Sequence, residues 1–142
     1  MRESITQEFE YGCGIACFAF ATRMTYQQAT KYLGEMQANS ERFWIKDLTN
    51  ALNVYGKNYV SRHIKPHLKI KVNEEGTIVL IRRSKRYPSG HYLIRHNGHW
   101  MDPWINVLLN SDIKSAKSGY RKRLPGRPMY ALFLQQKKTR IF

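Results

Sequence analysis

A cysteine set between two glycines is the residue of this sequence best suited to nucleophilic chemistry. Gly12-Cys13-Gly14 opens an apolar run that continues to Met24 and predicts a helix buried in the middle of a domain. Because a helix N-terminus presents unpaired N–H groups and a partial positive charge, it favours a thiolate over a thiol. The two glycines would leave room for a substrate backbone to approach the sulfur and would permit the dihedrals of a tight junction. We therefore expect Cys13 to be a nucleophile.

A cysteine nucleophile needs a base, and the sequence offers five histidines for that role. We favour His91, which begins a predicted strand directly after the flexible turn Pro88-Ser89-Gly90. A side chain at this point can project into a cleft while the sheet holds its backbone. His99, on the following strand, is the chief alternative. The other three lie in the connection before the first clear strand or in a hairpin turn: His63, His67 and His96.

The base in turn needs a group that fixes its tautomer, and a hairpin around Asn97-Gly98 supplies a candidate. A turn centred there pairs residues whose numbers sum to about 195. This places His91 near position 104, within a step or two of Asp102, which we expect to orient it. Gln7, six residues before the nucleophile, would donate its side-chain amide to a developing oxyanion.

The first part of the chain is predicted to be helical beyond the nucleophile helix as well. Thr25 and Gln28 have the spacing of a capping box, which predicts a helix over 25–33 that stops at Gly34. Apolar residues at helical spacing predict a further helix over 42–55, and the glycine that follows is suited to its C-terminal cap.

After residue 56 the hydrophobic period changes from about 3.6 to about 2, which indicates strands. Strands are predicted at 68–72, 77–81, 91–95, 99–101 and 129–134. A polar, lysine-rich stretch over 111–127 is expected to be a loop. Helices followed by a mainly antiparallel sheet indicate an α+β fold, in which the buried nucleophile-bearing helix packs against the sheet.

Length and composition favour one domain over residues 1–142, with a helical part of about 1–56 and a sheet part of about 57–142. No apolar run is long enough to span a membrane, and the start lacks the apolar region of a secretory signal, so we expect a cytoplasmic protein. Cys13 and Cys17, one helical turn apart, should be free thiols. A metal site made from these cysteines and the histidines is an alternative, although no second Cys/His pair at ligand spacing accompanies the two cysteines.

Charge is distributed unevenly along the chain. The net charge is +14 and the isoelectric point about 10.0. Residues 1–56 carry five basic and six acidic side chains, whereas residues 57–142 carry nineteen basic and four acidic ones, a net charge of +15. A field of this size attracts nucleic acid, an anionic membrane surface or an acidic protein. A solubilising surface is the simpler alternative.

Several of these residues together resemble a known family. Gln7, Cys13 with Gly14, Ala16-Cys17, a distant histidine that opens a strand and an Asp-Pro that closes the next are similar to a set of papain-like peptidase domains. Those domains process bacteriocin leader peptides in peptidase-containing ABC transporters. The resemblance implies a papain-like fold with Cys13 as nucleophile, His91 as general base, Asp102 as orienting group and Gln7 as oxyanion donor. It makes Cys17 a structural cysteine of the helix.

The sequence departs from that family in two places. The family commonly has aspartate before the nucleophile where Gly12 stands, and only eleven residues separate His91 from Asp102, which makes a tighter hairpin. The strong basicity resembles instead the small papain-fold modules that bacterial competition systems deliver as toxins. That second resemblance implies delivery into a target-cell cytoplasm and an acidic immunity or inhibitor protein as partner.

Two functions are therefore open. The first is a papain-like thiol hydrolase, a cysteine peptidase or a related acyl-transfer or deamidation enzyme, which acts on a peptide or protein and needs no cofactor. The second is an RNA-directed protein, either an RNA binder or a nuclease, because aromatic residues are interleaved with basic ones in the second half of the chain. These aromatic residues are Tyr87, Tyr92, Trp100, Trp104 and Tyr120.

Overall fold

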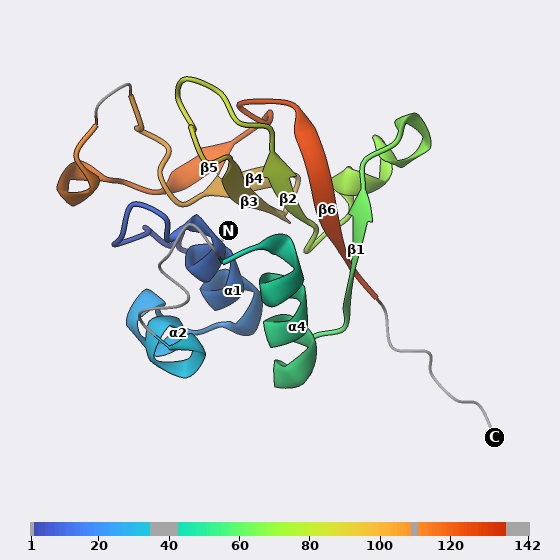
Figure 1. Cartoon of the computed structure of the whole chain (residues 1–142), viewed down its shortest axis with the longest axis horizontal. Helices are drawn as coiled ribbons and strands as arrows, with labels where there is room; N and C mark the ends of the chain where they lie inside the picture. The colour runs from blue at the N-terminus through green and yellow to red at the C-terminus, as the bar shows by residue number, and fades with distance from the viewer. Residues whose placement is uncertain (1, 35–42, 109–110, 136–142) are drawn as a thin grey trace.

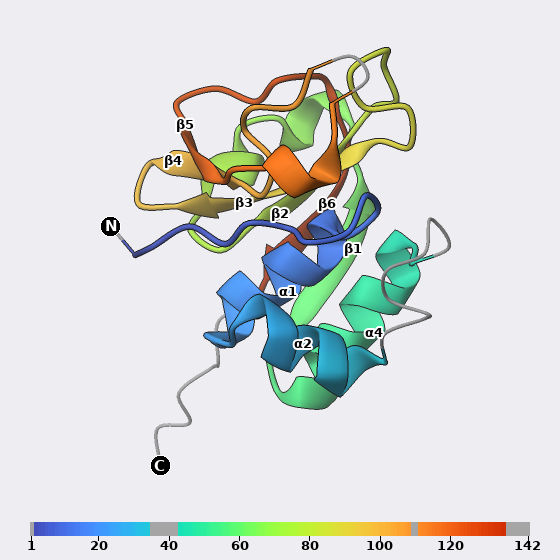
Figure 2. The same ribbon diagram turned by 90° about the vertical axis from the view of Figure 1, so that its left-hand side faces the viewer.

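The helix that begins at Cys13 lies between a sheet and two other helices. A computed structural model describes residues 2–34, 43–108 and 111–135. In it, α1 (Cys13–Thr22) packs against the sheet on one side and against α2 (Tyr26–Leu33) and α4 (Ile45–Tyr55) on the other. Figures 1 and 2 show this arrangement from two directions, with the sheet above α1, α2 below it and α4 beside it. Residues 15–20 are fully buried, as expected for a helix that is apolar on all sides.

Local signals in the sequence set the ends of the helices. The predicted capping box is confirmed, since the Gln28 N–H donates to Thr25 Oγ1 at 3.1 Å and the Thr25 N–H donates to Gln28 Oε1 at 2.9 Å. At the end of α4, Gly56 adopts φ 109°, a left-handed conformation that glycine enters without steric cost. The predicted start of that helix at 42 is wrong by a few residues. Trp44 is extended, with its N–H bonded to Asp47 Oδ2 at 3.0 Å, and residue 42 lies outside the described residues.

The sheet has six strands in the order β1-β6-β2-β3-β4-β5, and every neighbouring pair is antiparallel. The predicted α+β class with a mainly antiparallel sheet is therefore confirmed. The strands span Tyr59–His63 (β1), Ile78–Ile81 (β2), His91–His96 (β3), His99–Asp102 (β4), Gly119–Arg121 (β5) and Pro128–Leu134 (β6).

Both faces of this sheet are apolar, and each covers a separate hydrophobic cluster. The face toward α1 buries side chains such as Tyr92, Ile94 and Met101 with the helices. The opposite face buries Leu93 and Trp100 under loops and short helical turns. The site described below lies at one end of the sheet, where β3 begins and β4 ends.

The strand predicted at 68–72 is wrong, because this segment forms two short 3-10 helices, η1 (Pro66–Leu68) and η2 (Lys71–Asn73). Leu68 and Val72 face the core, while Ile70 between them is 83% exposed. Apolar residues at 68, 70 and 72 fit a strand period, but the two that turn inward are four residues apart, which is a helical spacing.

Two strands escaped prediction. One is β1, which places His63 in a strand rather than in a connection, and the other is β5, which lies inside the predicted loop over 111–127. The same loop contains a third 3-10 helix, η3 (Ile113–Ser115). Both are edge strands of the sheet that the structure describes. Within the described parts of the chain, no helix is long and apolar enough to cross a membrane.

Candidate active site

Cys13 is the first residue of α1 and remains partly accessible. The sequence suggested that the glycines beside it make room for a substrate, but in the structure that room is filled by side chains of the protein. A Cβ added to Gly12 would lie 1.9 Å from Tyr26 Oη, and one added to Gly14 would lie 3.1 Å from the Phe43 ring. Gly12 has φ −93°, which any residue adopts. The glycines therefore admit close packing of the protein's own aromatic side chains around the start of the helix.

His91 and Asp102 form a buried pair across the hairpin. The His91 Nε2 and Asp102 Oδ1 atoms are 2.6 Å apart, and the two residues are 3% and 0% exposed. The hairpin register is the predicted one, since His96 pairs with His99 and Arg95 with Trp100. The imidazole is also stacked on the Tyr87 ring, with centroids 4.3 Å apart and planes inclined by 8°. Two contacts on different sides thus fix the ring orientation.

Asp102 has two further donors that the sequence did not predict. Its Oδ1 accepts from the Trp104 N–H at 2.9 Å, and its Oδ2 accepts from Arg121 Nε at 2.6 Å. Arg121 is anchored by a second bond, from Nη2 to the Ile105 carbonyl at 2.9 Å. Arg121 was missed because it lies in β5, within the predicted loop, where three residues carry no periodic signal. With His91, three donors thus hold this carboxylate in place.

The electrostatics of the pair favour an imidazolium facing a carboxylate. Burial by itself would lower the pKa of His91, but hydrogen bonds to Asp102 and to the Cys13 side chain outweigh it and raise the pKa to about 9. Burial would raise the pKa of Asp102, yet bonds from His91, Arg121 and the Trp104 N–H lower it below its ordinary value. At neutral pH the pair is charged.

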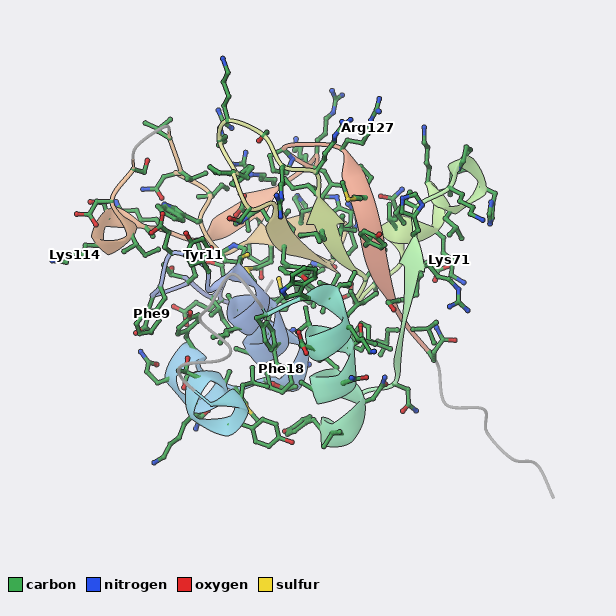
Figure 3. All side chains as sticks on the ribbon, in the orientation of Figure 1. Phe9, Tyr11, Phe18, Lys71, Lys114 and Arg127 are labelled. Atoms are coloured by element: carbon green, nitrogen blue, oxygen red, sulfur yellow. The ribbon has the colours of Figure 1, made fainter. Side chains whose placement is uncertain are left out.

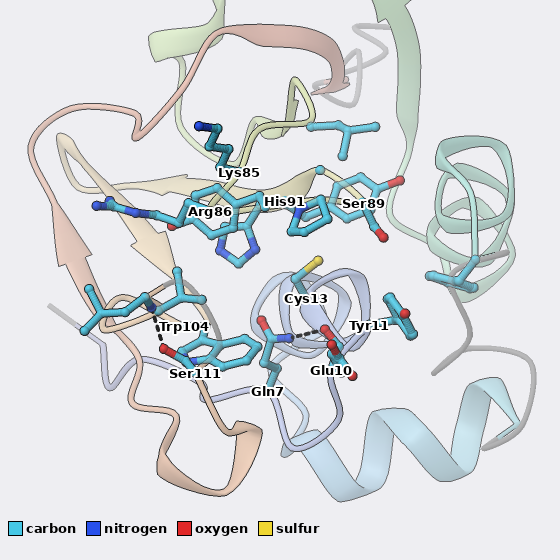
Figure 4. A pocket seen from close by; sticks show the side chains of 18 residues that line it. Gln7, Glu10, Tyr11, Cys13, Lys85, Arg86, Ser89, His91, Trp104 and Ser111 are labelled. Carbon is cyan, nitrogen blue, oxygen red and sulfur yellow. Dashed lines mark hydrogen bonds between the residues drawn. The ribbon is translucent and has the colours of Figure 1, made fainter.

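Only one ring nitrogen of His91 is bonded to Asp102, and the other is available to Cys13. Because Nε2 is bonded to Asp102, Nδ1 is the atom left to exchange a proton with the thiol. Cys13, His91 and Gln7 line one pocket of about 260 Å³ (Figure 4). Lys85 and Arg86 also border this pocket. The pocket therefore combines a thiol, a base and cationic side chains around one space.

Gln7 also reaches the pocket, but its amide is engaged elsewhere. The side chain is 1% exposed, and Nε2 donates to the Phe9 carbonyl at 3.0 Å and to the Glu10 carbonyl at 3.1 Å. Its Oε1 is buried without a hydrogen-bond partner among the described residues. The backbone N–H of Gln7 donates to the Pro103 carbonyl at 3.2 Å, which ties this segment to the end of β4. Both amide hydrogens are thus used within the loop that precedes α1.

The remaining sulfur and nitrogen candidates lie elsewhere. Cys17 is fully buried in the core, and burial raises its pKa well above the ordinary value, as expected of a structural cysteine. His99 contacts the Asn97 carbonyl near the hairpin turn, and His96 pairs with Glu75 at 2.9 Å. His63 packs edge-on against a tyrosine of β6. Among the described residues no group of three His, Cys, Asp or Glu side chains is placed to hold a metal ion.

Comparison with known proteins identifies the fold. No protein-family model and no curated protein matches the chain. Two similar solved structures are a double glycine motif protease from an AMS/PCAT transporter in complex with the leader peptide, and the peptidase domain of Streptococcus ComA, a bi-functional ABC transporter involved in a quorum sensing pathway. The first has a TM-score of 0.53 at 16% identity and covers 93% of this chain and 89% of its own. The second has a TM-score of 0.56 at 19% identity and covers 94% and 97%. At the level of fold, the predicted resemblance to transporter peptidase domains is confirmed.

Proposed function

We propose that this protein is a papain-like cysteine peptidase whose nucleophile is Cys13, whose general acid and base is His91 and whose orienting group is Asp102. The observation that carries the proposal is the buried His91–Asp102 pair at 2.6 Å, which leaves the second ring nitrogen for a thiol at the start of a helix. A hydrolase of this type needs a nucleophile, a base in contact with it and a third group that fixes the base. The fold shared with two peptidase domains supports the same conclusion.

In the proposed reaction, the Cys13 thiolate attacks the carbonyl carbon of a peptide bond, and the carbonyl oxygen becomes an oxyanion. The Cys13 N–H is in the first turn of α1, where N–H groups have no acceptor within the helix, so it is suited to bind that oxyanion. The His91 imidazolium then donates its Nδ1 proton to the leaving amine, and a thioester remains on Cys13. Neutral His91 next takes a proton from water, whose oxygen displaces the thiolate and releases the carboxylic acid.

The activity is tested by digestion of a denatured proteome, with the new peptide N-termini identified by mass spectrometry. We expect cleavage sites that are produced by the native protein and are absent with the Cys13→Ala variant, because only the native protein forms the thioester. If the products contained deamidated glutamine but no new N-termini, the protein would be a deamidase that uses the same residues and not a peptidase. No covalent chemistry at Cys13 in either readout would refute the proposal.

The oxyanion role of Gln7 gives a separate prediction. To donate to an oxyanion, the Gln7 amide must release one of its two carbonyl partners, at Phe9 or Glu10. We expect Gln7→Ala to lower kcat by about 10²-fold or more while KM changes little, the scale found for loss of one oxyanion donor. Steady-state kinetics together with thermal unfolding check this. An unchanged kcat with a lower Tm would mean that Gln7 only holds the loop.

A further inference from the structure

A second groove lies on the face of the sheet opposite α1. It has a volume of about 710 Å³ and lies between the η1–η2 segment and the connection from β5 to β6. The apolar part of its lining comes from Ile64, Val72 and Leu124, over the buried Trp100. Ile70, beside the groove residue Lys69, is largely exposed. Apolar surface of this kind gains free energy when a partner covers it.

Four cationic side chains surround this apolar surface: Lys69, Lys122, Arg123 and Arg127. All four are exposed, no acidic residue lines the groove, and none of the four has a salt bridge to a described carboxylate. Among the described lysines and arginines, Arg121 is the one that pairs with a carboxylate. Figure 3 shows Arg127 on the sheet side of the molecule, away from Phe18 in the helical layer. The charge of the groove is therefore left for a partner to neutralise.

A basic loop connects the edge of the groove to the catalytic pocket along the chain. The Arg82 N–H donates to the Arg127 carbonyl at 2.8 Å, which joins the end of β2 to the groove edge. The sequence continues as Arg82-Arg83-Ser84-Lys85-Arg86, and its last two residues border the pocket that holds Cys13. The four basic side chains of this loop are exposed, so the segment between the groove edge and the catalytic pocket is positively charged.

We propose that the groove binds an acidic segment, rich in aliphatic side chains, of the polypeptide that is cleaved at Cys13. The carboxylates of that segment pair with Lys69, Arg123 and Arg127, and its aliphatic side chains cover Ile64 and Leu124. The proposal rests on the proposed function, because it assigns the segment to the substrate. Binding at a site remote from the scissile bond restricts cleavage to chains that carry this segment.

The same surface is poorly suited to nucleic acid. Unpaired bases stack on exposed aromatic faces, yet Trp100 is 2% exposed, and the guanidinium of Arg95 lies 5.2 Å from its ring centre. Tyr87, Tyr92 and Trp104 are buried as well. The large aromatic side chains that are exposed among the described residues all belong to the range 9–55: Phe9, Tyr11, Tyr32, Trp44 and Tyr55. Four of the five aromatic residues that suggested RNA binding are therefore buried, and the fifth, Tyr120, is partly buried with its hydroxyl bonded to the Arg2 carbonyl.

The binding test uses a fluorescein-labelled synthetic peptide of Leu and Glu, with a Ser and Glu peptide of equal charge and a single-stranded RNA as comparisons. The groove variant carries Lys69→Glu, Arg123→Glu and Arg127→Glu. The control variant has the same change in net charge on the helical side, with Lys31→Glu, Lys46→Glu and Lys57→Glu, all exposed positions. Fluorescence anisotropy gives the Kd of each pair on the full chain.

We expect the groove variant to raise the Kd of the Leu and Glu peptide by about tenfold or more and the control variant by about twofold or less, because only the first removes close charge pairs. Equal binding of the Ser and Glu peptide, equal loss in both variants, or tighter binding of RNA to the same groove would overturn the proposal. The peptide Kd is measured without catalysis, so the result of the binding test does not depend on whether the protein is a peptidase.

The proteome digest provides the link to the substrate. Sites cleaved by the native protein are expected to carry acidic, aliphatic-rich sequence on one side, and the groove variant is expected to lose that enrichment while still cleaving. Cleavage without any such enrichment would place the acidic segment outside the substrate and overturn the proposal, even if the peptide binds. Absence of cleavage together with tight peptide binding would refute the peptidase assignment and the assignment of the segment to its substrate, while the groove would remain a binding site.

Discussion

Replacement of Cys13 by alanine is expected to abolish peptide cleavage without loss of the fold. Cys13 supplies the protein nucleophile of the proposed mechanism, and it is partly exposed at the start of α1, where alanine fits. Deletion of the nucleophile in a hydrolase triad lowers kcat by about 10⁵-fold or more. The measurement is kcat/KM on a peptide recovered from the proteome digest, with circular dichroism as the check on folding.

Cys17→Ala is the matched control for this prediction. Cys17 lies one turn further along the same helix and is fully buried, so its loss leaves a small cavity that costs about 1 kcal/mol of unfolding free energy. Activity should stay within about threefold of the native value, because the residue touches no reacting atom. In the folded native protein, iodoacetamide should modify Cys13 and spare Cys17, as peptide mapping would show. The reverse pattern in either experiment would exclude Cys13 as the nucleophile.

The second large effect is expected at Asp102, and pH separates its two roles. His91 has a pKa of about 9, raised above the ordinary 6.5, so the imidazolium is present below that pH and is lost as the pH rises through it. Since the imidazolium must give its proton to the leaving amine, kcat/KM should fall above about pH 9. Asp102→Ala removes both the hydrogen bond and the charge, and we expect it to lower kcat/KM at neutral pH by about 10²-fold or more.

Asp102→Asn distinguishes orientation from charge. An asparagine oxygen can still accept from His91 Nε2, so the ring stays oriented, but the negative charge that raises the pKa of His91 is gone. We expect this variant to retain more activity than Asp102→Ala and to lose it at a lower pH than the native protein does. Both variants leave Arg121 without its carboxylate, so urea unfolding should confirm that they remain folded at the assay temperature. If the activity of Asp102→Asn fell at the same alkaline pH as that of the native protein, a group other than His91 would control this loss of activity.

The candidate triad was predictable because each part of it depends on short-range signals. A hairpin turn at Asn97-Gly98 fixes which residues face each other, and the observed register is the one that the turn predicts. By that register the position opposite His91 is about 104, so Asp102 lies two positions away, close enough for the observed contact. In the same way, the capping residues and the apolar run around Cys13 define the helices that carry and support it.

The surroundings of the triad were not predictable, because they depend on contacts between distant segments. Arg121 reaches Asp102 from a strand of three residues, and Tyr87 stacks on His91 from a loop. The sequence also suggested that glycines give a substrate access to Cys13, whereas they admit Tyr26 and Phe43. None of these contacts leaves a pattern in the sequence, since each depends on where an entire chain segment packs.

By itself, the sequence determined a thiol at the start of a buried helix, a histidine and an aspartate on one hairpin, and a strongly basic second half. Only the tertiary structure decided how these are used. It bonded Asp102 to Arg121, buried four of the five aromatic residues that suggested RNA binding, and joined the basic loop after β2 to the edge of a groove on the far face of the sheet. The physical reason is range: turns and caps act over a few residues, whereas burial and charge pairing depend on which segments meet in the folded chain.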